Sequence, residues 1–132
     1  MGNRILLVED SPIIQAVAVH ALTEAGYEVS ARSTFDELIA GGVTGYDLIL
    51  MDVQMPELYG DDVAMVLRNE RGVTTPIYLF SSLDPDELAL RAESARVDGY
   101  ISKSEGMDHL VMRVRQILIT SSSAGSTGPG DP

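Results

Sequence analysis

Short, nearly continuous runs of apolar residues alternate along the chain with longer segments whose apolar residues recur every three or four positions. The runs at residues 5–8, 47–51 and 76–80 are typical of strands buried on both faces of a sheet. Residues 27–31 alternate between apolar and polar side chains, as a half-exposed edge strand does, and residues 97–102 form a short last run. The pattern therefore predicts five strands.

A helical pattern follows each predicted strand. The first helix has a clear start, because Ser11 offers a capping hydroxyl and Pro12 suits the first helical position, and Gly26 ends it. The later helices are predicted at about residues 33–40 and 60–70, from Asp84 onward, and through residues 107–118. Strict alternation of strands and helices predicts an α/β fold, with a parallel sheet covered by helices on both faces.

The 132 residues are enough for one domain, and residues 1–120 carry all of the predicted elements. Residues 121–132 contain no large apolar side chain, so they are predicted to be a flexible tail or linker. No apolar run approaches the roughly 18 residues that a membrane helix needs, and the start of the chain does not resemble a secretory signal. We therefore expect a cytoplasmic protein that does not enter a membrane.

Charge and cysteine content narrow the possible functions. The chain has 20 Asp and Glu residues against 9 Lys and Arg residues, a net charge of -11, which argues against binding to nucleic-acid phosphates or to an anionic membrane. It has no cysteine, which excludes disulfides, thiolate catalysis and cysteine-based zinc sites. His20 and His109 lack carboxylate partners at metal-binding spacing and are predicted to be ordinary surface or boundary residues.

Polar side chains follow four of the five predicted strands. They are three carboxylates, two hydroxyls and the only lysine of the chain: Glu9, Asp10, Asp52, Ser81, Ser82 and Lys103. Any one of them has an ordinary explanation, since an acid after a strand is more often a helix cap and a lysine there is usually solvated. Together they are harder to dismiss, because the carboxyl ends of parallel strands lie at one edge of the sheet.

This set of side chains predicts a particular chemistry. Three carboxylates held close together repel one another and need a cation, and oxygen ligands without His or Cys select a hard ion, Mg²⁺ before Ca²⁺. The lysine and a serine hydroxyl would then meet the oxygens of a phosphate. The sequence therefore predicts a phosphoryl-transfer site in which one carboxylate is the nucleophile.

Four segments carry a family resemblance: residues 6–11, residues 51–57 with Gly60, residues 76–81 and residues 98–103. They resemble the receiver domain of response regulators in two-component signalling, a CheY-like fold, and the match runs from about Arg4 to Ile119. The Met-Asp-x-x-Met-Pro-x-x-x-Gly motif is specific to that family. The resemblance implies a doubly wound five-stranded parallel sheet with strand order 2-1-3-4-5.

The resemblance also implies roles for individual residues. Asp52 matches the phospho-accepting aspartate and also touches the metal. Asp10 matches an acid that binds the metal, and Glu9 matches one that acts mostly through metal-bound water. The backbone carbonyl of Gln54 matches a further metal ligand.

Three more residues match the groups that respond to phosphorylation. Ser81 matches a hydroxyl that turns toward the phosphoryl group, and Lys103 matches the lysine that pairs with it. Tyr100 matches an aromatic switch residue that moves inward as the hydroxyl moves.

The implied function is Mg²⁺-dependent transfer of a phosphoryl group to Asp52 from a phosphohistidine on a sensor histidine kinase or a histidine phosphotransfer protein. Phosphorylation would change the surface of the last two β-α units, as in other two-state switches. The domain would act in signalling rather than as an enzyme, assisting only its own phosphorylation and dephosphorylation. A downstream partner or a fused output domain would read the change. Ile13 and Val17 are candidates for an apolar patch that docks the phosphoryl donor, although core packing would explain Val17 equally well.

The sequence departs from the family pattern after the lysine, where Ser104 stands in place of the usual proline. A cis bond without proline costs about 2.5–4 kcal/mol, so either the Lys103–Ser104 bond is trans and aims the lysine differently, or the peptide is strained. Glu9 replaces the commoner aspartate, and Gln54 and Leu83 are expected to tune the lifetime of the phosphoryl group.

Two other classes of function are weaker alternatives. A pseudo-receiver that only binds partners would typically lack an acid or the lysine, and none is missing here. An aspartate-nucleophile hydrolase would need an Asp-x-Asp pattern after the first strand. A nucleotide-binding domain would need a glycine-rich or hydroxyl-rich phosphate loop there, where Glu9 and Asp10 stand instead.

Overall fold

The computed structural model describes residues 3–55 and 58–127. Its five strands form one sheet in the order β2-β1-β3-β4-β5, and every neighbouring pair is parallel. The strands are β1 (Arg4–Val8), β2 (Glu28–Arg32), β3 (Leu48–Met51), β4 (Ile77–Ser81) and β5 (Gly99–Ser102). The predicted doubly wound sheet and its strand order are confirmed.

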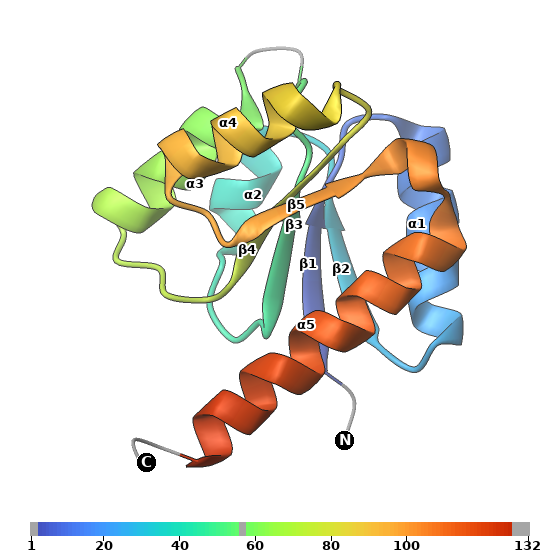
Figure 1. Cartoon of the computed structure of the whole chain (residues 1–132). Helices are drawn as coiled ribbons and strands as arrows, with labels where there is room; N and C mark the ends of the chain where they lie inside the picture. The colour runs from blue at the N-terminus through green and yellow to red at the C-terminus, as the bar shows by residue number, and fades with distance from the viewer. Residues whose placement is uncertain (1–2, 56–57, 128–132) are drawn as a thin grey trace.

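Helices cover both faces of the sheet, as predicted (Figure 1). α1 and α5 lie on one face, and α2, α3 and α4 lie on the other. The helices are α1 (Pro12–Glu24), α2 (Phe35–Gly41), α3 (Gly60–Asn69), α4 (Pro85–Ala95) and α5 (Met107–Thr127), with a short 3₁₀ turn, η1 (Lys103–Glu105), after β5. None of these helices combines the length and hydrophobicity that a span of the membrane requires, over the part of the chain that the structure describes.

The sheet separates two hydrophobic cores. Successive residues of β1 point to opposite faces, so that Leu6 and Val8 pack with α2, α3 and α4, whereas Ile5 and Leu7 pack with α1 and α5. All four side chains are fully buried, as the continuous apolar run predicts for a central strand. The residues of β2 are only half-buried or exposed, as predicted for an edge strand.

The predicted starts of two helices are confirmed by their caps. The Ser11 hydroxyl accepts a hydrogen bond from the Ile14 amide at 3.3 Å, with Pro12 at the first helical position of α1. The Asp84 carboxylate accepts one from the Asp86 amide at 3.0 Å at the start of α4. These local signals fix where each helix begins after its strand.

The last helix is longer than its apolar pattern indicates. α5 continues to Thr127, through the first residues of the segment 121–132 that is predicted to be a tail or linker. Nothing in this stretch forbids a helix, because the first proline comes only at Pro129. The rest of that segment, residues 128–132, lies outside the described residues, and the boundary of the domain at residue 120 stays a prediction.

A network of hydrogen bonds around Arg68 and Asp98 lies at the edge of the sheet where the strands begin. Arg68, near the end of α3, donates hydrogen bonds to the carbonyls of Val73 at 2.9 Å and Thr75 at 2.8 Å, and to the Asp98 carboxylate at 2.7 Å. The same oxygen of Asp98 accepts a hydrogen bond from the Ile77 amide at 2.9 Å. The network ties α3 to the starts of β4 and β5.

Candidate functional site

The candidate residues meet at the opposite edge, where the strands end. A cavity of about 370 Å³ opens there. Its lining includes the acids Glu9, Asp10 and Asp52, together with Gln54 and Lys103. Residues that lie more than 90 positions apart in the chain are therefore neighbours in space, as the parallel topology requires.

The three carboxylates form a tight and mostly buried cluster. Oxygens of Glu9, Asp10 and Asp52 lie within 4.8 Å of one another. Glu9 is 0% exposed and Asp52 is 3% exposed, because both follow strands at the centre of the sheet, while Asp10 is half-buried. Buried carboxylates are unfavourable unless a positive charge or hydrogen-bond donors compensate them.

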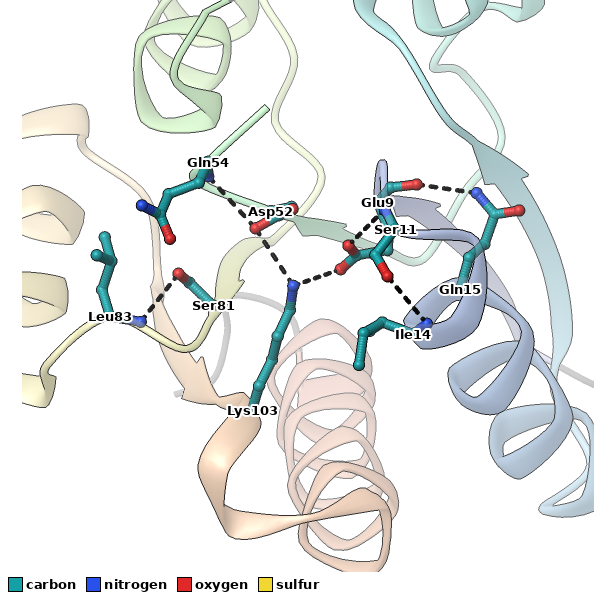
Figure 2. Close-up of polar contacts among 9 residues, drawn as sticks. All are labelled: Glu9, Ser11, Ile14, Gln15, Asp52, Gln54, Ser81, Leu83 and Lys103. Carbon is teal, nitrogen blue, oxygen red and sulfur yellow. Dashed lines mark hydrogen bonds and ion pairs between the residues drawn. The ribbon is translucent and has the colours of Figure 1, made fainter. Parts of the chain in front are cut away.

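Lys103 supplies one positive charge to this cluster (Figure 2). Its Nζ lies 2.6 Å from Glu9 Oε1 and 3.4 Å from Asp52 Oδ1. Glu9 Oε2 accepts a hydrogen bond from the Ser11 amide at 3.0 Å, whereas Oε1 has no hydrogen bond of good geometry despite the close ammonium group. One ammonium group against three carboxylates leaves the cluster with excess negative charge.

Burial and the neighbouring carboxylates together shift the acid–base equilibrium of Asp52. Burial raises the pKa of the Asp52 carboxyl, and the neighbouring Asp10 and Glu9 raise it further, to about 7. The Lys103 ammonium opposes this rise but does not cancel it. A cluster of carboxylate oxygens in this state is suited to a divalent cation, which would relieve the repulsion.

Of the other candidate residues, Gln54 contacts the acids directly, whereas Ser81 and Tyr100 are not among the residues that line the cavity. The backbone amide of Gln54 donates a hydrogen bond to Asp52 Oδ1 at 3.3 Å. Ser81 is buried and its hydroxyl accepts a hydrogen bond from the Leu83 amide at 3.2 Å, so it caps its own turn (Figure 2). Tyr100 is half-buried and packs against the core beneath α3 and α4.

The turn that carries Lys103 answers the question raised by the missing proline. The described residues contain no cis peptide bond, so Lys103–Ser104 is trans. The Ser102 hydroxyl accepts a hydrogen bond from the Ser104 amide at 3.3 Å, and the two hydroxyl oxygens lie 2.7 Å apart. This pair of serines holds the first turn of η1, and Lys103 still reaches Glu9 and Asp52. Ser102 is the signal for this turn in the sequence, because a serine hydroxyl often accepts a hydrogen bond from the backbone amide two residues later.

Gly60 has a steric role that the sequence pattern did not reveal. A Cβ atom at this position would lie 1.7 Å from the backbone oxygen of Asp52, so no larger residue fits. The Gly60 amide also donates to the Val53 carbonyl at 2.7 Å. The glycine of the motif therefore lets the start of α3 pack directly onto the backbone of the central acid.

Comparison with known proteins identifies the family. The model of the response regulator receiver domain matches residues 5–115. The transcriptional regulatory protein TcrA of Mycobacterium tuberculosis is 32% identical over 117 residues, covering 88% of this chain and 46% of the relative. The regulatory protein VanRB of Enterococcus faecalis is 34% identical over 119 residues, covering 89% of this chain and 53% of the relative. The chain thus spans about half the length of these relatives.

Solved structures agree with this match. The receiver domain of the Francisella response regulator 1452 is 25% identical, with a TM-score of 0.80, and the match covers 91% of this chain and 99% of that one. The response regulator TrrA of Thermotoga maritima, solved in complex with Mg²⁺-BeF, is 28% identical with a TM-score of 0.70, covering 87% and 98%. Sequence family, fold and relatives all coincide, so this chain belongs to the receiver domains of response regulators, which act in two-component signalling.

Proposed function

We propose that Asp52 is the residue of this receiver domain that accepts the phosphoryl group. The observation that carries the proposal is the pairing of a buried carboxylate at the end of β3 with the ammonium group of Lys103, 3.4 Å away, beside a cavity open enough for a phosphoryl group. The two further acids of the cluster, Glu9 and Asp10, complete the set that the family resemblance implies.

In the proposed reaction, a carboxylate oxygen of Asp52 attacks the phosphorus of a phosphohistidine. The bond between phosphorus and the imidazole nitrogen breaks as the bond to the carboxylate oxygen forms. Lys103 stabilises the negative charge on the transferred group and stays paired with it. The domain performs no chemistry other than its own phosphorylation and dephosphorylation, and its role is to signal.

The metal that fits this site is Mg²⁺. Glu9, Asp10, Asp52 and the backbone carbonyl of Gln54 would hold it, with Glu9 acting mostly through water, since an oxygen-only donor set favours a hard cation. Bound there, Mg²⁺ would neutralise charge on the carboxylates and on the phosphoryl oxygens. The structure of TrrA with Mg²⁺-BeF supports this choice of ion.

Ser81 and Tyr100 are proposed to convert phosphorylation into a change of surface. The Ser81 hydroxyl would leave the Leu83 amide and turn toward the phosphoryl oxygens, moving the chain between β4 and α4. Tyr100, which packs beneath α4, would then move inward. A downstream partner or a fused output domain would recognise the changed surface of the last two β-α units.

The proposed phosphoryl donor is a sensor histidine kinase or a histidine phosphotransfer protein. Ile13 is 75% exposed and Val17 is 45% exposed on α1, so core packing does not account for these side chains. The neighbouring Ile14 lines the cavity that holds Asp52. An apolar patch beside the acceptor is a suitable place for a donor helix to dock.

Labelling with a small phosphoryl donor tests the assignment of Asp52. We expect wild-type protein to be phosphorylated by acetyl phosphate in the presence of Mg²⁺, and labelling to disappear when EDTA removes the metal. Asp52→Asn keeps the size of the side chain and should abolish labelling. Labelling that persists in Asp52→Asn would contradict the proposal.

A further inference from the structure

Arg91 of α4 contacts two side chains at the start of α3, Asp61 and Tyr59, and one in its own helix, Glu87. Its Nη1 donates to both carboxylate oxygens of Asp61, at 3.2 and 3.1 Å. Its Nε and Nη2 each lie 3.0 Å from Oε2 of Glu87, one turn earlier in α4. The guanidinium also stacks on the ring of Tyr59, with Cζ 4.9 Å from the ring centroid. All three nitrogens of this guanidinium therefore contact a carboxylate, and its plane stacks on an aromatic ring.

The residues that Arg91 holds lie next to the acceptor. Tyr59 pairs with Gln54 in an isolated antiparallel bridge. The backbone amide of Gln54 in turn donates a hydrogen bond to Asp52 Oδ1 at 3.3 Å. Between Tyr59 and Asp61, Gly60 packs against the backbone oxygen of Asp52. A short series of contacts thus leads from α4 through Tyr59 and Gln54 to the acceptor carboxylate.

The strength of these contacts suits a positioning role. The side chain of Asp61 is only 12% exposed and that of Arg91 27% exposed, so their ion pair is partly shielded from water. A planar guanidinium that binds two carboxylate oxygens and stacks on a ring fixes orientation as well as distance, which a single ammonium group does not. Arg91 therefore limits how far Tyr59 can move relative to α4.

We propose that Arg91 is a positioning residue for phosphoryl acceptance, which holds Tyr59 and Asp61 so that the backbone of Gln54 stays in register with Asp52. The inference rests on the proposed function of Asp52, since it concerns how that site is held. It adds a consequence for signalling, because the same contacts make the position of α4 and the geometry of the acceptor depend on each other.

The alternative is that Arg91 only fastens α4 to α3 and affects stability alone. Arg68→Met is a matched control for this possibility. Arg68 extends from α3 and, like Arg91, binds a carboxylate, and it also donates to three carbonyls, but it does so at the opposite edge of the sheet. Both substitutions remove a guanidinium and keep a long side chain, and only one removes contacts that lead to Asp52.

The experiment compares the rate of phosphorylation by acetyl phosphate with Mg²⁺ in wild type, Arg91→Met and Arg68→Met. It is run at a temperature at which circular dichroism shows every variant to be folded. We expect Arg91→Met to be slowed at least about threefold relative to Arg68→Met, a change of the size that couplings through packed networks produce. If Arg91→Met does not fold, Arg91→Lys is compared with Arg68→Lys against the same threshold.

A double variant tests the route through Tyr59. If the route is correct, Tyr59→Leu slows phosphorylation, and adding it to Arg91→Met slows the reaction little further. A slowing of less than threefold in Arg91→Met, or effects of the two substitutions that multiply, would overturn the inference. Failure of wild type to be labelled, or labelling of Asp52→Asn, would instead overturn the assignment of Asp52, so the two failures are distinguishable.

Discussion

The two edges of the sheet differ in how their charged side chains are paired. Where the strands begin, the guanidinium of Arg68 meets one carboxylate, Asp98, and the remaining donors bind backbone carbonyls. Where the strands end, the single ammonium group of Lys103 meets a cluster of three carboxylates, Glu9, Asp10 and Asp52. The first arrangement is balanced in charge and the second is not.

This difference separates a structural role from a functional one. A balanced network, in which one guanidinium pairs with one carboxylate and donates to three backbone carbonyls, acts to hold elements together. An unbalanced cluster beside a cavity is unfavourable in the protein alone, and binding of a cation stabilises it. Four predictions test the comparison.

The largest expected effect is on the rate of phosphorylation. Lys103→Met removes the ammonium group that faces Asp52 and keeps a long side chain. Loss of a group that stabilises developing charge typically costs about 100-fold in rate, so we expect a fall of about that size with acetyl phosphate and Mg²⁺. Arg68→Met should keep the wild-type rate in the same assay. A rate for Lys103→Met within tenfold of wild type would contradict the difference between the two cations.

The second prediction is that Arg68 matters for the stability of the fold rather than for the rate of phosphorylation. Arg68→Met leaves three backbone carbonyls without this donor and removes the cation that pairs with Asp98, so we expect the free energy of unfolding to fall by about 2 kcal/mol. Urea denaturation followed by circular dichroism measures it. A change of less than about 0.5 kcal/mol would show that this network does not stabilise the fold as described.

Mg²⁺ should stabilise wild-type protein, because it binds the folded cluster and relieves its repulsion. At about 100 times its dissociation constant, a ligand that binds only the folded state adds about 2.7 kcal/mol, which corresponds to several degrees in Tm. Thermal denaturation with Mg²⁺ and with EDTA measures the shift. The same shift in a variant that lacks two of the acids, Asp10→Asn with Asp52→Asn, would place the ion elsewhere.

The smallest expected effect is a pH dependence in the metal-free protein. The pKa of Asp52 is raised from 3.8 to about 7 in the folded state, so the folded protein binds more protons than the unfolded chain between these values. The contribution of Asp52 to stability is therefore fully present below about pH 4 and is lost as the pH rises through about 7. The full shift of about three pKa units corresponds to about 4 kcal/mol, and because the cavity opens to solvent, which screens the charges, we expect a difference of about 1–2 kcal/mol.

Asp52→Asn is the control for this pH effect. Because asparagine does not titrate, the variant should lack the decline and should be more stable than wild type at pH 8 in EDTA. Urea denaturation from pH 4 to pH 8 measures both proteins. Parallel curves for the two would show that the Asp52 carboxyl has an ordinary pKa in the folded state.

The strands, the helices and the parallel α/β class could be predicted from the sequence because their determinants are local, whereas the strand order came from the family resemblance. The apolar run of β1 and the helix caps Ser11 and Asp84 can each be recognised within a few residues. The alternation of such strand and helix patterns then indicates the α/β class. The meeting of Glu9, Asp52 and Lys103 could also be predicted, since parallel strands end at the same edge of a sheet.

Other features depend on contacts that no local pattern encodes. Arg91 lies on an amphipathic helix, where an arginine normally faces solvent, and its partner Asp61 is distant in the chain. The requirement for Gly60 depends on how closely α3 approaches the backbone of Asp52. The length of α5 could not be read from apolar periodicity, because its last residues carry no large apolar side chains.

The most direct test of the central claim is to locate the phosphoryl group in wild-type protein. The chain is incubated with acetyl phosphate and Mg²⁺, and tandem mass spectrometry of its peptides identifies the modified residue. The unbalanced edge of the sheet predicts one modification, on Asp52, that is absent when EDTA is present. Modification of a different residue, or of none, would contradict the account.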